Sequence, residues 1–391
     1  MEQSEYRVLR KGIDSLDVAF MGCLPSSVRA LMRDAKAKAT SEGKPEYVVI
    51  EGVHGHIGKT GASGGYAFCF DTGPDGEIWT IKDNPDPREW NIRVSVANAQ
   101  LAVNGYHETK AALYGRLEAF GAKVIDESIS RVDFAVDFVA EGFTLDVGLV
   151  SCHSHSQMLV RGDDQEGIPL GGSEFVVSYA NRMSNSVTIG KMPGRQTIIY
   201  DKRREVARKV SSHWYALWGF EKDDCPPIWR VEMRAGKIHL KEWKITTFED
   251  LEVKFAALFG SACQAVRMMK RQPEPGENVT RVPDHALWAI LREEVNTALV
   301  PYMAKADRKR VVEGRREDIQ DMYRNGVMGW CVSYAVAMGN TPEEAAHEFA
   351  QVIADEFSAF ASRDPVQFKR KYFAADKRLF FIDEQREGVP F

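Results

Sequence analysis

The sequence predicts an α+β protein with a duplicated strand-helix-strand core of mostly antiparallel sheets, followed by an all-helical C-terminal domain. Two observations predict this class. Strand-length runs of alternating apolar and polar residues, together with helical stretches, occur in two successive groups before residue 272. Beyond that point, apolar residues recur almost entirely at helical spacing. The order of the strands does not follow from the sequence.

Composition excludes several classes of protein. The chain has 391 residues, 44% of them hydrophobic, and is long enough for two or three packed domains. No stretch approaches the roughly 18 uninterrupted apolar residues of a membrane span, and the charged N-terminus lacks the layout of a signal peptide. The six cysteines include no Cys-x-x-Cys pair, which indicates neither a zinc site nor a disulfide framework. We therefore expect a cytoplasmic protein without a membrane partner.

An N-terminal α+β region is predicted over residues 1–125. It begins with a strand near 13–20 and an amphipathic helix over 25–38, where Ser26 and Ser27 are typical of a helix start. A closing helix is expected over 107–122. Between these helices, turns rich in Gly, Pro and Asp separate four predicted strands, at 47–51, 65–70, 78–82 and 90–96.

A second α+β region is predicted over 126–271. Helices are expected from Tyr200 to about residue 218 and over 247–271, where Thr247 and Asp250 form a capping signal. The predicted strands lie at 131–137, near 146–160, near 174–180, at 197–200 and at 229–235.

The remainder of the chain is predicted to be helical. Residues 272–282 have the proline, glycine and polar content of a linker. The region 283–391 then forms the helical C-terminal domain, with Thr341 and Glu344 as a capping box for its last predicted helix. Its helices are expected near 284–303, 306–338 and 341–362.

Two aspartates share one face of the strand 131–137. Alternation places Arg131, Asp133 and Asp137 on that face and apolar residues on the other. Two carboxylates on one face invite a metal ion. However, they lie about 13 Å apart along an ideal strand, so they cannot both ligate one ion directly. A buried ion pair between Arg131 and an aspartate is the structural alternative.

Tyr200 ends a predicted strand with Lys202 on the same face. A tyrosine with an ordinary pKa near 10 is a poor nucleophile, but a nearby cation or metal favours the phenolate. An aryl oxide is also a workable leaving group when a phosphodiester is rejoined. Packing is the alternative role for a strand tyrosine.

A third motif places Arg230, Glu232 and Arg234 on one strand face. Glu232 is a suitable ligand for a hard cation such as Mg²⁺ or Mn²⁺, and the arginines are suited to phosphate oxygens. A cross-strand salt bridge is the alternative. His153 and His155 share a further strand face, and we expect them at most to flank this site because Ser154 departs from the usual histidine-pair pattern.

Positive charge is concentrated around these motifs. The formal net charge of −5 argues against a protein that coats nucleic acid through bulk electrostatics. Between residues 191 and 244, however, thirteen Lys and Arg stand against seven Asp and Glu. A solvated helix face explains the charges at 202–209 equally well, but it does not explain the strand arginines.

The three motifs together resemble the replication initiation factor family of rolling-circle plasmid and phage initiators and related conjugative relaxases. The resemblance covers roughly residues 10–245. It is carried by Ile13-Asp-Ser-Leu, Arg131-Val-Asp-Phe-Ala-Val-Asp137, Thr197-Ile-Ile-Tyr200-Asp-Lys202-Arg-Arg-Glu205 and Trp229-Arg-Val-Glu232-Met-Arg234.

This resemblance implies a role for each candidate residue. Tyr200 is implied as the nucleophile that attacks a DNA phosphodiester, with Lys202 as a second catalytic residue. The implied ligands of Mg²⁺ or Mn²⁺ are Asp133, Asp137 and Glu232. The implied contacts to DNA phosphates are Arg131, Arg203, Arg230 and Arg234.

The implied reaction is a transesterification that leaves a 5′-phosphotyrosyl enzyme and a free 3′-hydroxyl to prime DNA synthesis. The nick site must be unpaired, as single strand or hairpin, for a strand tyrosine to reach it. Origin DNA in a bacterial host is thus the expected partner. A host helicase and a second copy of the chain are further expected partners of the helical C-terminal domain.

Two alternatives stay open at this point. A conjugative or mobilisation relaxase has the same chemistry and differs in whether the joined DNA is replicated in place or transferred. A non-catalytic, sequence-specific DNA-binding protein would keep every function after Tyr200→Phe.

Overall fold

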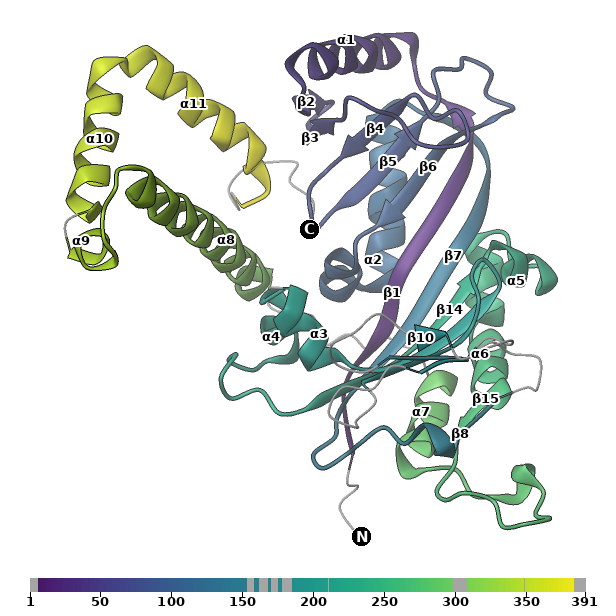
Figure 1. Cartoon of the computed structure of the whole chain (residues 1–391). Coiled ribbons are helices and arrows are strands. Elements are labelled where there is room, and N and C mark those ends of the chain that lie inside the picture. The colour runs from purple at the N-terminus through teal and green to yellow at the C-terminus, as the bar shows by residue number, and fades with distance from the viewer. Residues whose placement is uncertain are drawn as a thin grey trace.

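The computed structural model describes residues 6–152, 158–161, 168–169, 175–177, 185–209, 211–297, 308–347 and 349–382. These residues form a thirteen-stranded sheet with helices packed against it and a helical arm (Figure 1). The predicted α+β class, with a mostly antiparallel sheet and a helical C-terminal region, is confirmed. No helix among the described residues is long and apolar enough to cross a membrane.

Two long strands, β1 (Arg7–Cys23) and β7 (Lys123–Val139), form the centre of the sheet and pair antiparallel along their length. Beyond β1 lie β6 (Trp90–Val96), β5 (Glu77–Ile81), β4 (Phe68–Asp71), β3 (Val53–Ile57) and β2 (Glu46–Ile50). Beyond β7 lie β14 (Ile228–Gly236), β13 (Arg195–Asp201), β12 (Ser186–Gly190), β9 (Met158–Arg161), β11 (Phe175–Val177) and β10 (Ile168–Pro169). Neighbours are antiparallel except β9 and β11. The two predicted halves therefore meet at β1 and β7 within one sheet.

Alternation along β7 separates the core from the polar face. Phe134 points to the core, where its ring centroid lies 5.5 Å from those of Phe255 and Phe259 in α6 (Phe248–Ala265). Burying an aromatic side chain of this kind contributes roughly 1.5–3 kcal/mol. Helix α2 (Asn98–Ala119) packs against β1, and its Tyr106 Oη donates to Glu252 of α6 at 2.9 Å. The polar residues of β7 lie on the opposite face.

Shorter elements complete the body. Helix α7 (Ala286–Asn296) packs on α6 and buries Trp288, whose Nε1 donates to the Cys263 carbonyl at 3.1 Å. This helix follows the predicted linker, and the division of the chain into domains stays a prediction. The other body elements are α1 (Ser26–Glu42), α3 (Lys202–Lys209), α4 (His213–Trp218), α5 (Lys237–Glu242), β8 (Val150–Cys152) and β15 (Val266–Met268).

Several elements differ from their predicted bounds. Strand β1 is longer than the predicted 13–20 because it pairs with both β6 and β7. Strand β3 was not predicted. Helix α2 begins nine residues before the predicted 107, since its first turns continue past the non-helical Gly105, with φ 77° and ψ 178°. The predicted capping box of α6 is confirmed. Parts of the predicted segments 146–160, 174–180, 284–303 and 306–338 lie outside the described residues.

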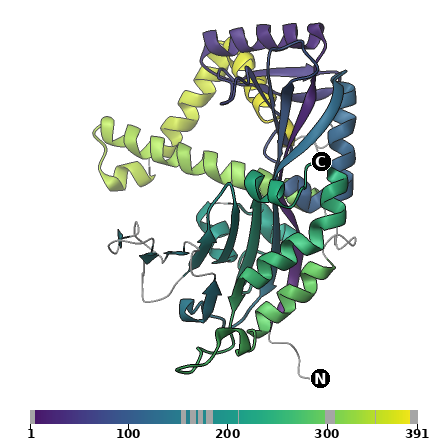
Figure 2. The ribbon, with the colours of Figure 1, turned by 90° about the vertical axis from the view of Figure 1, so that its right-hand side faces the viewer.

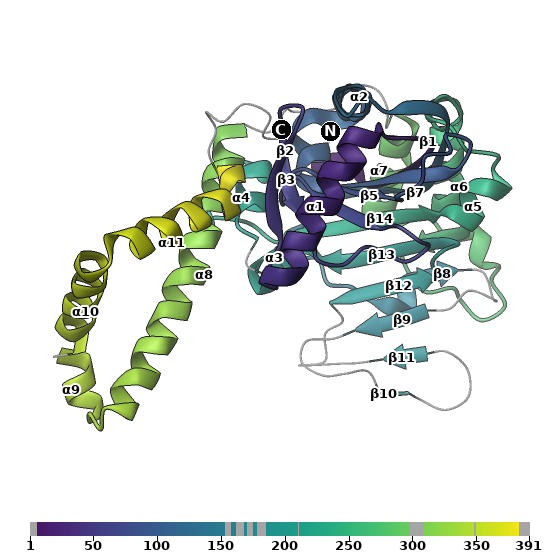
Figure 3. The same cartoon turned by 90° about the horizontal axis from the view of Figure 1, so that it is seen from above.

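The arm consists of α8 (Arg308–Ala337), α9 (Pro342–His347), α10 (Phe349–Arg363) and α11 (Pro365–Arg378) and projects from the body (Figure 2). Near its start, Arg315 forms an ion pair with Asp75 at 2.8 Å. Beyond its end, Phe380 packs with Tyr47 and His56 on the β2–β3 edge. Both ends of the arm thus contact the body, and the helices between them extend away from it (Figure 3).

Candidate active site

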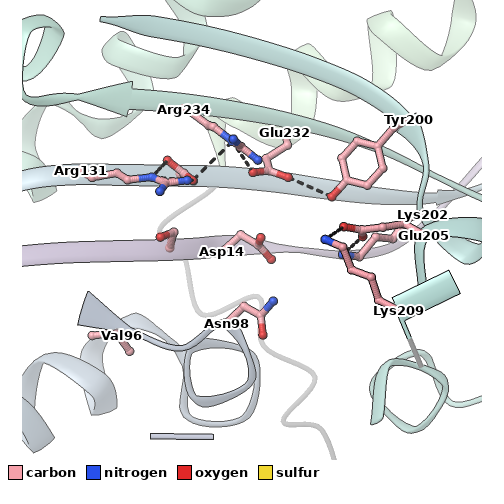
Figure 4. Close-up of a pocket in the computed structure, with 12 residues that line it drawn as sticks. Asp14, Val96, Asn98, Arg131, Tyr200, Lys202, Glu205, Lys209, Glu232 and Arg234 are labelled. Carbon is pink, nitrogen blue, oxygen red and sulfur yellow. Dashed lines mark hydrogen bonds and ion pairs between the residues drawn. The ribbon is translucent and has the colours of Figure 1, made fainter. Parts of the chain in front are cut away.

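A cavity of about 270 Å³ opens on the polar face of the sheet (Figure 4). Strands β1, β7, β13 and β14 and helix α3 supply most of its lining. The lining is dominated by ionisable side chains from the three sequence motifs. Among the predicted site residues, those that line it are Arg131, Asp133, Tyr200, Lys202, Glu232 and Arg234.

Strand register brings the motifs together. Strand β14 lies between β13 and β7 and pairs antiparallel with both. Arg234 pairs in register with Asp133, and Glu232 lies opposite Ala135 on β7 and Ile198 on β13. Because side chains alternate along each strand, the polar residues of β14 and β7 all project to the same face. The three motifs therefore lie next to one another on one face of the sheet.

Tyr200 is hydrogen-bonded to the carboxylate of Glu232. Its Oη donates to Glu232 Oε2 at 2.9 Å, while Arg234 Nε donates to Glu232 Oε1 at 2.7 Å. Burial, with a smaller contribution from Glu232, raises the pKa of Tyr200 well above its ordinary value, although Arg230 opposes this. The neighbouring cation Arg230 does favour the phenolate, as expected, but burial has the larger effect on the pKa of Tyr200. Glu232 is in position to accept the phenolic proton.

Asp133 is buried and paired with Arg131. Arg131 Nε donates to both carboxylate oxygens at 3.0 Å, and Arg234 Nε lies 3.7 Å from Oδ2. Burial raises the pKa of Asp133 to about 7, even though Arg131 lowers it. The ion pair that sequence reasoning kept as the structural alternative is thus present. The Arg131 side chain remains one third exposed, which leaves it accessible from the cavity.

Lys202 reaches the cavity from the first residue of α3 rather than from a strand. Its ammonium forms an ion pair with Glu205 and lies 4.4 Å from the Trp214 ring centroid. Burial is the largest cause that lowers the pKa of Lys202. Its distance from the Tyr200 ring centroid, 5.6 Å, keeps the two residues adjacent as predicted. Lys209, also on α3, is the most exposed cation of this group, with 61% of its side chain accessible.

Asp137 and Arg230 form a closed network that does not line the cavity. Arg230 donates to both oxygens of Asp137, at 2.5 and 2.9 Å, and to Asp14 at 2.9 Å. Trp218 Nε1 donates to Asp137 at 2.8 Å, and the Trp214 ring lies 4.4 Å from the Arg230 guanidinium. The Arg230 side chain is 0% exposed. Neither direct metal ligation by Asp137 nor direct phosphate contact by Arg230 fits this geometry, because both side chains are buried against each other and neither lines the cavity.

Arg203 also departs from its expected place. It lies on the exposed side of α3, where its Nη1 donates to the Cys225 carbonyl at 2.6 Å. The helix begins at Lys202, so the strand alternation assumed for the preceding residues no longer applies. Arg203 is therefore directed away from the cavity. His153 and His155 lie outside the described residues.

Sequence reasoning missed several residues that line the site, among them Asp14, Asn98, Glu205 and Lys209. Asp14 lines the cavity from β1, and Arg230 is the main charge that lowers its pKa to about 2 against the opposing effect of burial. Asn98, at the start of α2, and Glu205 also line the cavity. Asp14 lay within the Ile13-Asp-Ser-Leu motif, whereas nothing in the local sequence distinguishes Asn98. Its position depends on β6 pairing with β1.

The donor set suits a hard cation only in part. The part of the chain that the structure describes contains no cluster of three or more His, Cys, Asp or Glu arranged to hold a metal. Asp133 and Glu232 nevertheless project into the same cavity, and Mg²⁺ commonly takes one or two carboxylates together with water and phosphate oxygens. A divalent cation beside Asp133 would also favour its ionised form, which burial now disfavours. The residues are therefore compatible with Mg²⁺ or Mn²⁺.

No family model matches the sequence, and no curated protein matches it. Among solved structures, the chain is similar to a rolling circle replication initiator protein from Geobacillus stearothermophilus. That similarity covers 75% of this chain and 99% of the other, with 14% sequence identity and a TM-score of 0.41.

Proposed function

We propose that this protein nicks one strand of origin DNA by transesterification at Tyr200 and thereby initiates rolling-circle replication. The observation that carries the proposal is the hydrogen bond from Tyr200 Oη to Glu232 in a cavity lined by Arg131 and Arg234. A potential nucleophile, a proton acceptor and cations suited to phosphate are adjacent there. The motif resemblance supplies the substrate class.

The proposed reaction assigns each step to a residue of the chain. Tyr200 Oη attacks the phosphorus and passes its proton to Glu232, the geometry expected of a general base. The bond from phosphorus to O3′ breaks as the phosphotyrosyl bond forms. The departing O3′ takes a proton from Lys202, since a lowered pKa makes that ammonium a better acid.

The cations that remain accessible to solvent would bind the DNA phosphates. Arg131 and Arg234 retain 33% and 28% side-chain exposure, and Lys209 lies at the rim. The planar guanidinium groups of the two arginines favour bidentate contacts to phosphate oxygens, whereas the Lys209 ammonium acts as a point charge. Asp133 and Glu232 would hold the Mg²⁺ or Mn²⁺, which when bound supplies Lewis-acid polarisation of the phosphoryl oxygen.

The test compares wild-type and Tyr200→Phe protein on supercoiled plasmid that carries the DNA flanking the protein's own gene. We expect a relaxed product and a protein–DNA adduct on denaturing gels in Mn²⁺, lost in EDTA and lost in Tyr200→Phe, which retains DNA binding. Equal adducts from both proteins would move the nucleophile elsewhere. Tight binding without any adduct would favour the non-catalytic DNA-binding alternative.

A further inference from the structure

Lys202 belongs to a small part of the body that has an apolar cluster of its own. Helices α3 and α4 contribute most of this cluster, which buries Val206, Trp214 and Trp218 and is separate from the main core. A small satellite cluster buries much less apolar surface than a main core, and the local stability of a segment follows its buried apolar contacts. Contacts from outside the cluster therefore contribute strongly to holding α3 and α4 in place.

The first turns of α8 form the base of the arm and supply such contacts to the start of α4. Gly314 is buried so closely against α4 that a Cβ in its place would lie 3.0 Å from the His213 Cα. The Asp318 carboxylate accepts the backbone N–H of Ser212 at 2.8 and 3.0 Å. Arg315 Nη2 lies 3.3 Å from His213 Nε2. The base of the arm therefore holds the start of α4.

Helix α4 also carries Trp214, whose ring lies against two cations. The ring centroid is 4.4 Å from the Lys202 ammonium and 4.4 Å from the Arg230 guanidinium. An aromatic face attracts a cation at this distance, and more strongly where water is excluded. Both Trp214 and Lys202 are buried. Together with the ion pair to Glu205, the Trp214 ring therefore fixes the position of the Lys202 ammonium.

We propose that the base of the arm, acting through α4, positions Lys202 for its step in the nicking reaction. The proposal rests on the proposed function, in which Lys202 gives a proton to the departing O3′. Trp214 is the positioning residue because it lies against the ammonium, and Gly314 is the contact through which α8 holds α4. A displacement of α8 relative to α4 would therefore slow bond cleavage and leave phosphate binding by Arg131 and Arg234 unchanged.

The test uses Gly314→Val, which places a β-branched side chain against α4. Gly326→Val is the matched control, because it is the same change in the same helix and a Cβ at Gly326 would meet nothing within 4 Å. Hydrogen exchange followed by mass spectrometry reports on α3 without any DNA. We expect faster exchange in α3 for Gly314→Val and wild-type exchange there for Gly326→Val. Equal exchange in α3 for the two variants would overturn the proposal, whether or not the protein nicks DNA.

Single-turnover nicking of two single-stranded oligonucleotides then tests the role of Lys202. One carries the normal O3′ at the nick site, and the other carries sulfur in its place, a leaving group that needs no proton. With O3′, we expect Gly314→Val to slow the reaction roughly 10–100-fold, within the about 100–10,000-fold that a positioned acid contributes, at unchanged DNA affinity. With sulfur, the variant should react at close to the wild-type rate. Equal slowing on both substrates would show general damage to the site and contradict the proposal.

Variants of Trp214 examine the same step without changing the arm. Trp214→Phe retains an aromatic face for the ammonium and should nick the O3′ substrate at nearly the wild-type rate. Trp214→Leu should be slow on that substrate and recover with sulfur, and a wild-type rate for it on O3′ would refute the positioning role. If the wild type cleaves neither substrate while exchange in α3 still depends on Gly314, the proposed function and the role of Lys202 both fail, but the hold of the arm on α3 stands.

Discussion

Strand β7 carries two aspartates on its polar face, Asp133 and Asp137, and their surroundings differ although their local sequences are similar. Asp133 and Asp137 are both buried aspartates on one strand face, and each forms an ion pair with an arginine. The Asp133 end opens into the cavity, and its partner Arg131 is one third exposed. The Asp137 end is closed by Trp218 and by Arg230, which is 0% exposed. The same residue pair therefore serves the candidate site at one end and the fold at the other.

The difference arises from what packs over each end. Helix α4 brings two tryptophans over Arg230 and Asp137, with the Trp214 ring against the guanidinium and the Trp218 indole on the carboxylate. Within the part of the chain that the structure describes, no such helix covers Asp133, which faces the cavity. A buried pair with complete hydrogen bonding is costly to break from one side. A half-open pair can exchange its partner for a ligand.

Truncating the two arginines should produce the largest contrast. Arg230→Ala leaves Asp137 without its cation and Asp14 with only the longer ion pair to Arg10, and we expect a loss of about 3–5 kcal/mol in unfolding free energy. Arg131→Ala should cost about 1 kcal/mol or less, since that pair is partly exposed to solvent. Urea unfolding followed by tryptophan fluorescence measures both. Equal losses would show that the two ends do not differ in the way described.

The pH dependence of stability should distinguish the Asp133 end. Its folded-state pKa of about 7 exceeds the ordinary 3.8, so the folded state favours the protonated carboxyl. The stability that the protonated Asp133 carboxyl contributes is fully present below about pH 4 and is lost as pH rises through 7. Asp133→Asn should therefore gain stability relative to wild type over this range, by up to about 1.4 kcal/mol per pH unit. Denaturant titrations in EDTA test this, and parallel curves for the two proteins would contradict it.

The pH dependence of stability that Asp14 contributes has the opposite sign to that of Asp133. Its pKa is lowered to about 2, so its stabilising contribution is present above about pH 4 and is lost as pH falls through 2. Asp14→Asn should thus lose stability at neutral pH, and that difference should shrink only in acid. The pH range in which Asp14 changes the stability, about 2 to 4, therefore lies below the range of about 4 to 7 for Asp133.

A variant of Trp218 tests how the Asp137 end is closed, with a smaller expected effect than Arg230→Ala. Trp218→Phe keeps most of the apolar ring but removes the indole donor to Asp137. We expect a cost of about 1.5–3 kcal/mol, the usual range for a hydrogen bond to a charged group. Thermal unfolding of the variant beside Trp330→Phe, an exposed tryptophan on α8, provides the comparison. A larger loss in Trp330→Phe would contradict the assignment.

Periodicity predicted the fold class and most strands because alternation directly encodes which face of a strand is buried. It placed Arg131, Asp133 and Asp137 on one face, as β7 shows. It did not distinguish the two aspartates, because their difference depends on tryptophans some eighty residues away in the chain. For the same reason it misassigned Arg230. Lys202 and Arg203 were misplaced locally, where the strand ends and α3 begins. The different roles of Asp133 and Asp137 depend on contacts between residues far apart in the sequence, and residue spacing cannot predict these contacts.

The most direct measurement maps the covalent adduct. Wild-type protein is incubated in Mn²⁺ with a single-stranded oligonucleotide that carries the nick site, digested with protease and nuclease, and examined by peptide mass spectrometry. The account predicts a phosphodeoxynucleotide on Tyr200 alone, with a free 3′-hydroxyl on the released fragment. An adduct on another residue, or a released fragment ending in a 3′-phosphate, would contradict the proposed transesterification.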